Sequence, residues 1–237
     1  MSEPGDIPGE RGARVSLEGV AVVTGASAGI GMAVARELHE RGMRVVVASR
    51  RIDILEELAA EIDGLAVACD VTSWDQVKAL VDAAVEWGGS LDVMVNNAGF
   101  GAFGELHELD PARTALMVQT NITGVIYGMR AAGEIMARQG RGGIVNISSI
   151  VGDFPDPGGG AYAATKAAVD LLSRTGYREL RSHGVHVVNI KPALTDTEFS
   201  AVARGASGRR TGGDPPSKVA RWVCDALESG SANAGYR

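Results

Sequence analysis

The fold of this chain is decided by a stretch near its start, residues 20–31, which reads VAVVTGASAGIG. Its first four residues form an apolar, β-branched run that is typical of a buried strand. Three glycines follow, at Gly25, Gly29 and Gly31, and an amphipathic segment over 30–40 comes directly after them. A strand, a glycine-rich turn and a helix in this order predict the first unit of a parallel α/β sheet.

The glycine-rich turn has the composition of an anion-binding loop. Gly25 permits a sharp turn, Gly29 lets the backbone approach a pyrophosphate, and Gly31 lets the helix pack close to the strand. The start of the helix adds free N–H groups and a positive dipole end. An ordinary glycine turn is the alternative interpretation. The expected contacts with a bound dinucleotide are Gly25, Ser27, Ala28, Gly29, Ile30 and Gly31.

Short apolar runs alternate with longer amphipathic segments along the rest of the chain. Strands are predicted over 20–23, 44–48, 65–68, 91–95, 143–147 and 185–190, and helices over 30–40, 54–62, 74–87, 111–139, 161–182 and 218–227. Asn121 interrupts the longest of these helical segments. Continuous apolar strands separated by helices favour a parallel sheet covered on both faces. The right-handed crossover rule then predicts a three-layer, doubly wound sheet of the Rossmann type.

Length and composition narrow the class of protein. A chain of 237 residues suits one α/β domain, which we place at 17–237 behind a flexible N-terminal tail at 1–16. The net charge of -6 lacks the basic surplus of a nucleic-acid binder. Cys69 and Cys224 form no disulfide framework, so a reducing compartment is expected. Since no signal peptide and no apolar run of ~20 residues is present, we expect a cytoplasmic protein outside the membrane.

The second predicted strand ends at Ser49, and two arginines follow it. Proteins that bind NAD usually place an acid at this position, where it takes the ribose hydroxyls. Ser49 is followed here by Arg50 and Arg51, and a guanidinium pairs with the 2′-phosphate that an acid would repel. The pattern predicts a preference for NADP(H) over NAD(H). The alternative is that both arginines only begin a surface helix.

A tyrosine and a lysine share one face of the helix predicted over 161–182. Tyr162 and Lys166 are four residues apart. A phenol with a pKa near ~10 is a poor base at neutral pH. A nearby ammonium and an oxidised nicotinamide ring would favour the phenolate and lower that pKa. Tyr162 could then exchange a proton with a carbonyl and its alcohol. The spacing alone is weak evidence, because such pairs are common on helix surfaces.

Polar residues also end two further predicted strands. Ser148 and Ser149 follow the strand over 143–147, and Asn96 to Gly99 follow the strand over 91–95. The carboxyl ends of parallel strands share one edge, and that edge carries the ligand crevice in doubly wound sheets. These residues are therefore expected at the same edge as the glycine loop.

Together these segments resemble the short-chain dehydrogenase/reductase family in its common single-domain form. The similarity runs from about Gly19 to Thr197, with the motifs in the family's order. These motifs are Thr24-Gly25-x-x-x-Gly29-x-Gly31, Asp70-Val71, Asn96-Asn97-Ala98-Gly99, Asn121, Ser149 and Tyr162-x-x-x-Lys166. The resemblance implies an oxidoreductase that needs no metal, because nicotinamide supplies the hydride.

The resemblance also implies catalytic roles. Tyr162 would be the general acid in carbonyl reduction, and Lys166 would hold the nicotinamide ribose and lower the pKa of Tyr162. Ser149 is preferred over Ser148 because of its distance from Tyr162, and it would hydrogen-bond the substrate oxygen. Asn121 would position a water that relays protons past Lys166.

Further cofactor contacts follow from the same resemblance. Asp70 and Val71 would border the adenine, while Asn97, Ala98 and Gly99 would line the floor under the adenosine and the nicotinamide ribose. The segment 191–197 would lie beside the nicotinamide amide and the pyrophosphate. Its expected contacts are Pro192, Leu194, Thr195 and Thr197.

Two places depart from the family pattern. Ala193 stands where the family usually has a glycine, which would narrow the nicotinamide end slightly. Residues 229–237 are small and polar, so we expect the seventh strand of the sheet to be missing or vestigial. A homodimer through the helices over 111–139 and 161–182 would survive this loss, whereas a tetramer is in doubt.

The expected reaction interconverts a carbonyl and a secondary alcohol by hydride transfer, but the sequence does not name the substrate. Pocket walls are expected from 100–103, 150–157 and a substrate loop at about 194–216, which is either a lid that closes on binding or a solvated loop. One alternative is a catalytically silent NADP(H)-sensing regulator, which the presence of both Tyr162 and Lys166 disfavours. Another is an enoyl reductase or an epimerase, which the Tyr–Lys spacing and the lack of a large C-terminal region disfavour.

Overall fold

The computed structural model describes residues 13–196 and 212–235, so that part of the predicted tail and of the predicted substrate loop lies outside the described residues. The strands are β1 (Val20–Thr24), β2 (Arg44–Ser49), β3 (Leu65–Ala68), β4 (Val93–Asn96), β5 (Gly142–Ile147), β6 (Val185–Lys191) and β7 (Asn233–Gly235). The longer helices are α1 (Gly29–Glu40), α2 (Ile52–Glu61), α3 (Trp74–Gly88), α4 (Pro111–Val118), α5 (Gly124–Gln139), α6 (Gly160–Leu180) and α8 (Pro216–Ser229).

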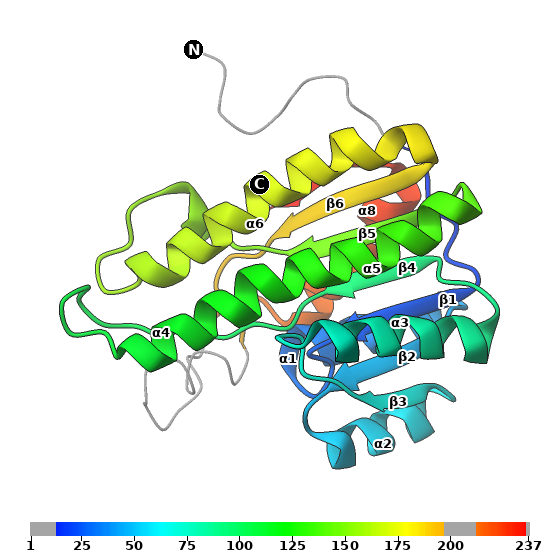
Figure 1. Cartoon of the computed structure of the whole chain (residues 1–237), viewed down its shortest axis with the longest axis horizontal. Helices are drawn as coiled ribbons and strands as arrows, with labels where there is room; N and C mark the ends of the chain where they lie inside the picture. Colours follow the sequence, from blue (N-terminus) through cyan, green and yellow to red (C-terminus); the bar gives the residue numbers. More distant parts are fainter. Residues whose placement is uncertain (1–12, 197–211, 236–237) are drawn as a thin grey trace.

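The strands form one parallel sheet in the order β3-β2-β1-β4-β5-β6-β7. The chain starts at the centre with β1, runs outward to β3, and then returns to the other side of β1 with β4 (Figure 1). The prediction of a doubly wound, Rossmann-type sheet is therefore confirmed. The direction of winding reverses between β1 and β4, and in such sheets a ligand crevice opens at that place.

Helices cover both faces of the sheet, because the strand residues alternate between two apolar cores. Ala21 and Val23 of β1 join the core under α1, α2 and α8, whereas Val20 and Val22 join the core under α3, α5 and α6. All four side chains are fully buried. A strand that is apolar on both faces needs both helix layers, which explains the continuous apolar runs in the sequence. Within the described ranges, no helix is long and apolar enough to span a membrane.

The long helix predicted over 111–139 is one continuous rod with an irregularity in it. Asp110 accepts a hydrogen bond from the backbone N–H of Ala112 and begins the rod, and Gly140, in a left-handed conformation, ends it. Between α4 and α5 the backbone widens into a π-helical turn at Gln119–Thr123 (η1). Asn121 is in this turn and is 1% exposed, so the predicted interruption is a turn that directs a polar side chain inward.

The seventh strand is vestigial, the second of the two expected alternatives, because it is present but only three residues long. Asn233–Gly235 pairs in parallel with the end of β6. The backbone N–H of Asn189 also donates to the carbonyl of Ala232 at 3.0 Å. A strand ladder is formed by backbone groups, so small polar residues can extend a sheet at its edge in spite of their poor strand propensity.

At the opposite, amino-terminal edge of the sheet, one carboxylate joins several strands. Asp92 accepts hydrogen bonds from the backbone N–H of Val20 at 3.0 Å, from the Ser90 hydroxyl, and from Arg141 at 3.1 Å. The Asp92 side chain is 9% exposed and that of Arg141 is 65% exposed. Asp92 therefore satisfies a buried donor at the start of β1 while it binds the residue that precedes β5.

Asp92→Ala should lower the free energy of unfolding by about 2–4 kcal/mol, because it leaves the N–H of Val20 buried without its acceptor. Arg141→Ala removes only an exposed partner of the same carboxylate and should cost less than ~1 kcal/mol. Urea unfolding followed by circular dichroism measures both values. Equal losses in the two variants would show that the Val20–Asp92 hydrogen bond is not the important contact.

Candidate functional site

The predicted site residues gather at the carboxyl edge of the sheet, around the ends of β1, β4, β5 and β6. Gly25 follows β1, Asn97 follows β4 and Ser149 follows β5. Tyr162 and Lys166 are in the first turns of α6, which begins at Gly160 after the loop that leaves β5. The sheet order therefore places these distant segments of the chain side by side.

The glycine loop is shaped by close packing. Gly25 and Gly29 have φ values of +65° and +57°, which favour glycine. A Cβ on Gly31 would lie 2.4 Å from both the Asn97 amide nitrogen and the Gly25 carbonyl oxygen. A side chain at Gly31 would therefore displace Asn97 or the loop. The glycine is required by this contact, in addition to the predicted packing of helix against strand.

Thr24 and Asn97 hold the loop against the end of β4. The Asn97 amide nitrogen donates to the carbonyls of Thr24 at 2.9 Å and Gly25 at 3.2 Å. The Thr24 hydroxyl accepts from the backbone N–H groups of Asn97 and Ala98 at 3.1 and 3.2 Å and donates to Val95. Asn97 thus braces the loop with its side chain, a contact that its predicted place on the cofactor floor did not include.

The start of α1 is suited to an anion. Ala28 is its N-cap and provides no side-chain hydrogen bond, and the first turn of the helix contains no acidic residue. The first N–H groups of a helix need an outside acceptor. With the positive end of the helix dipole, they fit the phosphates of a dinucleotide.

Arg51 lies beside this loop. Its guanidinium donates from Nε and Nη2 to the Ser27 hydroxyl at 3.2 and 3.0 Å. The backbone N–H of Arg51 is bound by the Ser49 hydroxyl at 3.1 Å, which fixes the turn after β2. Arg50 and Arg51 are both exposed. Because its guanidinium binds Ser27, Arg51 is the arginine that lies at the glycine loop.

Lys166 is buried and connects α6 to the end of β5. Its ammonium donates to the carbonyl of Ile147 at 2.9 Å, and its own backbone carbonyl accepts from the Ser148 hydroxyl at 3.0 Å. The residue is 6% exposed. Ser148 is therefore occupied by this internal bond, while Ser149 is only partly buried, in agreement with the choice of Ser149 over Ser148 as the candidate for substrate contact.

Burial governs the protonation of Tyr162 and Lys166. Desolvation lowers the pKa of Lys166 to about 8, and the charge of Asp170 opposes that change. Burial raises the pKa of Tyr162 above its usual range. The predicted lowering of the Tyr162 pKa by Lys166 is therefore not produced by the protein's own groups, although the Lys166 ammonium lies 5.6 Å from the centroid of the phenol ring.

One wall of the site is formed by Phe103. Its ring lies 5.4 Å from the ring of Tyr162, centroid to centroid. The backbone N–H of Gly104 donates to the carbonyl of Gly158 at 2.8 Å, which joins the loop after β4 to the glycine segment before α6. An aromatic side chain therefore borders the face of Tyr162, within the wall predicted over 100–103.

Asn121 is surrounded by protein groups. Its amide nitrogen donates to the Phe100 carbonyl at 2.9 Å and the Thr165 hydroxyl at 3.0 Å, and its oxygen accepts from the Phe100 N–H at 3.0 Å. A Cβ on Gly99 would lie 3.0 Å from that oxygen and 3.8 Å from the Lys166 ammonium. Both amide donors are used, so the side chain braces the loop after β4 against α6. A role in a proton relay remains a prediction.

Ser149 is held at the end of β6. Its hydroxyl is 3.4 Å from the Pro192 carbonyl and 3.4 Å from the N–H of Val151. Ser149 is also the N-cap of a short 3₁₀ turn, Ile150–Asp153 (η2). The hydroxyl is therefore oriented by two long, weak hydrogen bonds, and the one that it donates to Pro192 could pass to a stronger acceptor.

The remaining predicted cofactor contacts lie on the flanks of this edge. Asp70 accepts from the N–H and hydroxyl of Thr72 at 3.0 and 2.8 Å, and Val71 packs beside Gly124. After β6, Thr195 forms a parallel bridge with Asp214, which brings the two described ends of the predicted substrate loop together. Pro192 and Thr195 are buried and Leu194 is 42% exposed, whereas Thr197 lies outside the described residues.

Two contributors to the site were not identified from the sequence. Thr165 binds the Asn121 amide, and the charge of Asp170 acts on Lys166. Threonine is common, and nothing in the spacing of Thr165 marks it. Asp170 follows Lys166 by four residues, which would have placed it on the same helix face as Tyr162 and Lys166.

The free energy of unfolding should reveal the lowered pKa of Lys166. The pKa is 10.5 in the unfolded chain and about 8 in the folded protein, so the unfolded state binds the extra proton between these values and the wild type gains stability as the pH rises through this window. Relative to Lys166→Met, which has no such group, the wild type should gain about 2 kcal/mol between pH 7 and 9.5. Urea titrations of both proteins across this range measure the difference. A difference independent of pH would contradict the lowered pKa.

Comparisons with known proteins agree with this architecture. Residues 19–207 match the model of the family described as short chain dehydrogenase. An uncharacterised oxidoreductase of Staphylococcus aureus (strain N315) is 34% identical over 216 residues, which cover 90% of this chain and 92% of that protein.

Two solved structures are also similar. A short-chain dehydrogenase/reductase from Burkholderia phymatum in complex with NAD has a TM-score of 0.86 and 30% identity, with 93% of this chain and 89% of that chain covered. An alcohol dehydrogenase from the archaeon Thermococcus sibiricus, complexed with 5-hydroxy-NADP, has a TM-score of 0.82 and 30% identity, with 93% and 96% covered. The family match over most of the chain, the shared fold and the grouping of the motif residues at one sheet edge together show that this chain belongs to the short-chain dehydrogenase family of oxidoreductases.

Proposed function

We propose that this chain is an NADP(H)-dependent oxidoreductase that interconverts a carbonyl and a secondary alcohol. The observation that carries the proposal is that Tyr162, Lys166 and Ser149 lie together at the end of β5. Hydrogen bonds attach α6, which bears Tyr162 and Lys166, to this end of the strand, at the same sheet edge as the glycine loop. A phenol, a buried ammonium and an oriented hydroxyl at one edge are the groups that proton transfer to a carbonyl oxygen requires.

The residues at this edge fit a dinucleotide. The glycine loop, with Gly25 and Gly29 at positive φ, and the uncapped start of α1 would hold the pyrophosphate. Asp70 and Val71 would border the adenine, and Asn97 to Gly99 would lie under the sugars. Pro192, Leu194, Thr195 and Thr197 would contact the nicotinamide end.

Bound nicotinamide would supply the hydride. The protein's part is to move a proton at the Tyr162 oxygen and to stabilise charge on the substrate oxygen through the Ser149 hydroxyl. Lys166 would contact the ribose hydroxyls and place a positive charge beside the phenol. Burial raises the pKa of Tyr162, so the phenol holds its proton at neutral pH and is in the form that donates it in carbonyl reduction.

Arg51 supports the choice of NADP(H). Its guanidinium lies on Ser27 of the glycine loop and would pair with a 2′-phosphate. The two similar structures contain NAD in one case and an NADP derivative in the other, so the comparisons leave the preference open. The side chain of Arg51 is therefore the argument for NADP(H).

Three further features complete the proposal. Both cysteines are buried free thiols, in accord with a reducing, cytoplasmic location.

Ile126 on α5 and Leu171 on α6 are 41% and 59% exposed, and a homodimer through these helices would cover them. Phe103 would give the substrate an apolar wall beside Tyr162.

Turnover of NADPH with a panel of ketones and aldehydes tests the activity. Tyr162→Phe should lower kcat by about 10²–10⁴-fold, because the proton donor is lost, while NADPH still binds. Tyr127→Phe makes the same change on α5, away from the site, and should leave kcat unchanged. Tight NADPH binding without turnover of any carbonyl would reject the proposed activity and favour the sensing regulator.

Arg51→Ala tests the cofactor preference. The KM for NADPH should rise by about 10–100-fold, because a charge-assisted hydrogen bond is lost, and the KM for NADH should change little. The matched control is Arg36→Ala. Arg36 is an exposed arginine of α1 that pairs with Glu61 at the end of α2. An equal rise in KM for both cofactors would show that Arg51 does not recognise the 2′-phosphate.

A further inference from the structure

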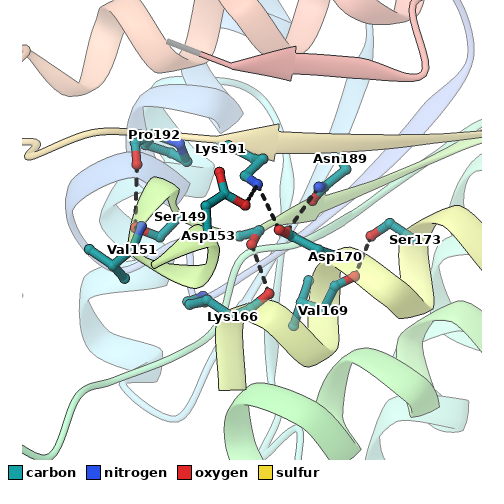
Figure 2. A network of polar contacts seen from close by, with 11 residues as sticks. Ser149, Val151, Asp153, Lys166, Val169, Asp170, Ser173, Asn189, Lys191 and Pro192 are labelled. Carbon is teal, nitrogen blue, oxygen red and sulfur yellow. Dashed lines mark hydrogen bonds and ion pairs between the residues drawn. The ribbon is translucent and has the colours of Figure 1, made fainter. Parts of the chain in front are cut away.

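Lys191, at the end of β6, joins two carboxylates from different segments. Its ammonium donates to Asp170 of α6 at 2.8 Å and also to Asp153 of the η2 turn (Figure 2). The Lys191 side chain is 20% exposed, and the side chains of Asp170 and Asp153 are 12% and 50% exposed. The pair with Asp170 is thus well shielded from solvent, where an ion pair is worth more than on an open surface.

This ion pair network lies at the far end of the turn that begins with Ser149. At the near end, the N–H of Ile150 and the hydroxyl of Ser149 both donate to the Pro192 carbonyl, at 3.2 and 3.4 Å. At the far end, Asp153 binds Lys191. The η2 turn is therefore attached at its near end to Pro192 and at its far end to Lys191, the last residue of β6, by an ion pair.

The turn also lies directly against α6 at Lys166. A Cβ on Gly152 would lie 2.8 Å from the backbone nitrogen of Ala167 and 3.0 Å from the carbonyl carbon of Lys166. Backbone packs on backbone at this point, so a shift of the turn would move Ser149 relative to Lys166. This close packing of backbone on backbone is less directional than the hydrogen bonds of Lys191.

Asp170 connects the network to Lys166 by its charge. It follows Lys166 by four residues on α6, so both side chains lie on one helix face. One Asp170 oxygen accepts from the Asn189 amide at 3.0 Å and the other accepts from Lys191. Lys191 therefore both fixes this carboxylate and compensates its negative charge.

We propose that Lys191 is a positioning residue, which holds the Ser149 turn through Asp153 and sets the field at Lys166 through Asp170. The inference deepens the proposed function and rests on it for the roles of Ser149 and Lys166. Lys191 itself need not touch the substrate. It acts through two carboxylates, Asp153 of the η2 turn and Asp170 of α6, which both bind its ammonium.

The groups that face Lys166 make the electrostatic half of this proposal specific. Tyr162 and Asp170 face Lys166 from α6 itself. The neutral groups that face it are the carbonyl of Ile147 at the end of β5 and the side chain of Asn121 in η1, on the other side of Gly99. Lys191 of β6, and Asp153 of η2 through Lys191, act on Lys166 by way of Asp170. Among these groups, Asp170 provides the charge that favours the ammonium of Lys166, and Lys191 offsets that charge.

Kinetics of four variants test the positioning half. Lys191→Met should lower kcat by about tenfold or more, because small displacements of catalytic groups are costly, while the KM for NADPH stays within about threefold. Lys191→Arg keeps both ion pairs and should restore most of kcat. Asp153→Asn should lower kcat through the turn alone. Lys78→Met removes an exposed lysine–aspartate pair on α3 and should change neither constant.

The titration of Lys166 tests the electrostatic half without any turnover. Its ¹³Cε resonance in protein labelled at lysine is assigned by its loss in Lys166→Arg and is followed from pH 6.5 to 9.5. Lys191→Met leaves Asp170 uncompensated and should raise the midpoint above that of the wild type. Asp170→Asn removes the favourable charge and should lower the midpoint. Asp153→Asn should leave it near the wild-type value.

Shifts of opposite sign in Lys191→Met and Asp170→Asn, with the kcat loss restored by Lys191→Arg, support the inference. Unmoved midpoints, or shifts of the same sign, overturn it, as does a wild-type kcat in Lys191→Met. If Lys191→Met does not fold, Asp170→Asn and Asp153→Asn still give both readouts. If the wild type turns over no carbonyl, the proposed function fails, and the titration alone decides whether Lys191 sets the charge at Lys166.

Discussion

The site depends on one buried hydrogen bond, from the ammonium of Lys166 to the carbonyl of Ile147. A buried cation needs a partner, and the carbonyl of Ile147, the last residue of β5, provides it. This bond, and the bond from Ser148 back to the Lys166 carbonyl, attach α6 to the end of β5. Tyr162, one turn earlier on the same helix, is placed at the sheet edge as a consequence.

Polar contacts below the edge support this arrangement. Asn96 and Asn146 are partners in the register of β4 and β5, and their side chains are bonded at 2.8 Å within the core. Asn146 also donates to Ser173 of α6 at 2.9 Å. The same helix is thus attached to the sheet at two levels, by Ser173 in the interior and by Lys166 at the edge. Buried amides that are all satisfied give a rigid support, which a site for proton transfer needs.

Each side of the site is built from segments that meet only in the folded chain. The glycine loop is held by Thr24 and Asn97, from β1 and the end of β4. The loop after β4 is held to α6 by Asn121 from the π-helical turn. These braces use side chains that belong to the family motifs, so part of the role of those motifs in this chain is to join loops to one another.

The sequence by itself determined the parallel, doubly wound sheet, the glycine loop and the Tyr162–Lys166 pair, because strand periodicity, glycine spacing and helix spacing are local properties. Only the tertiary structure decided which of Arg50 and Arg51 lies at the loop, that Gly31 is required by Asn97, and that β7 forms at all. It also showed that burial raises the pKa of Tyr162, so that the expected lowering requires the bound, oxidised nicotinamide in addition to Lys166. A spacing of four residues places an ammonium near the phenol. Desolvation, in contrast, depends on every group that packs around the phenol, and that environment exists only in the folded chain.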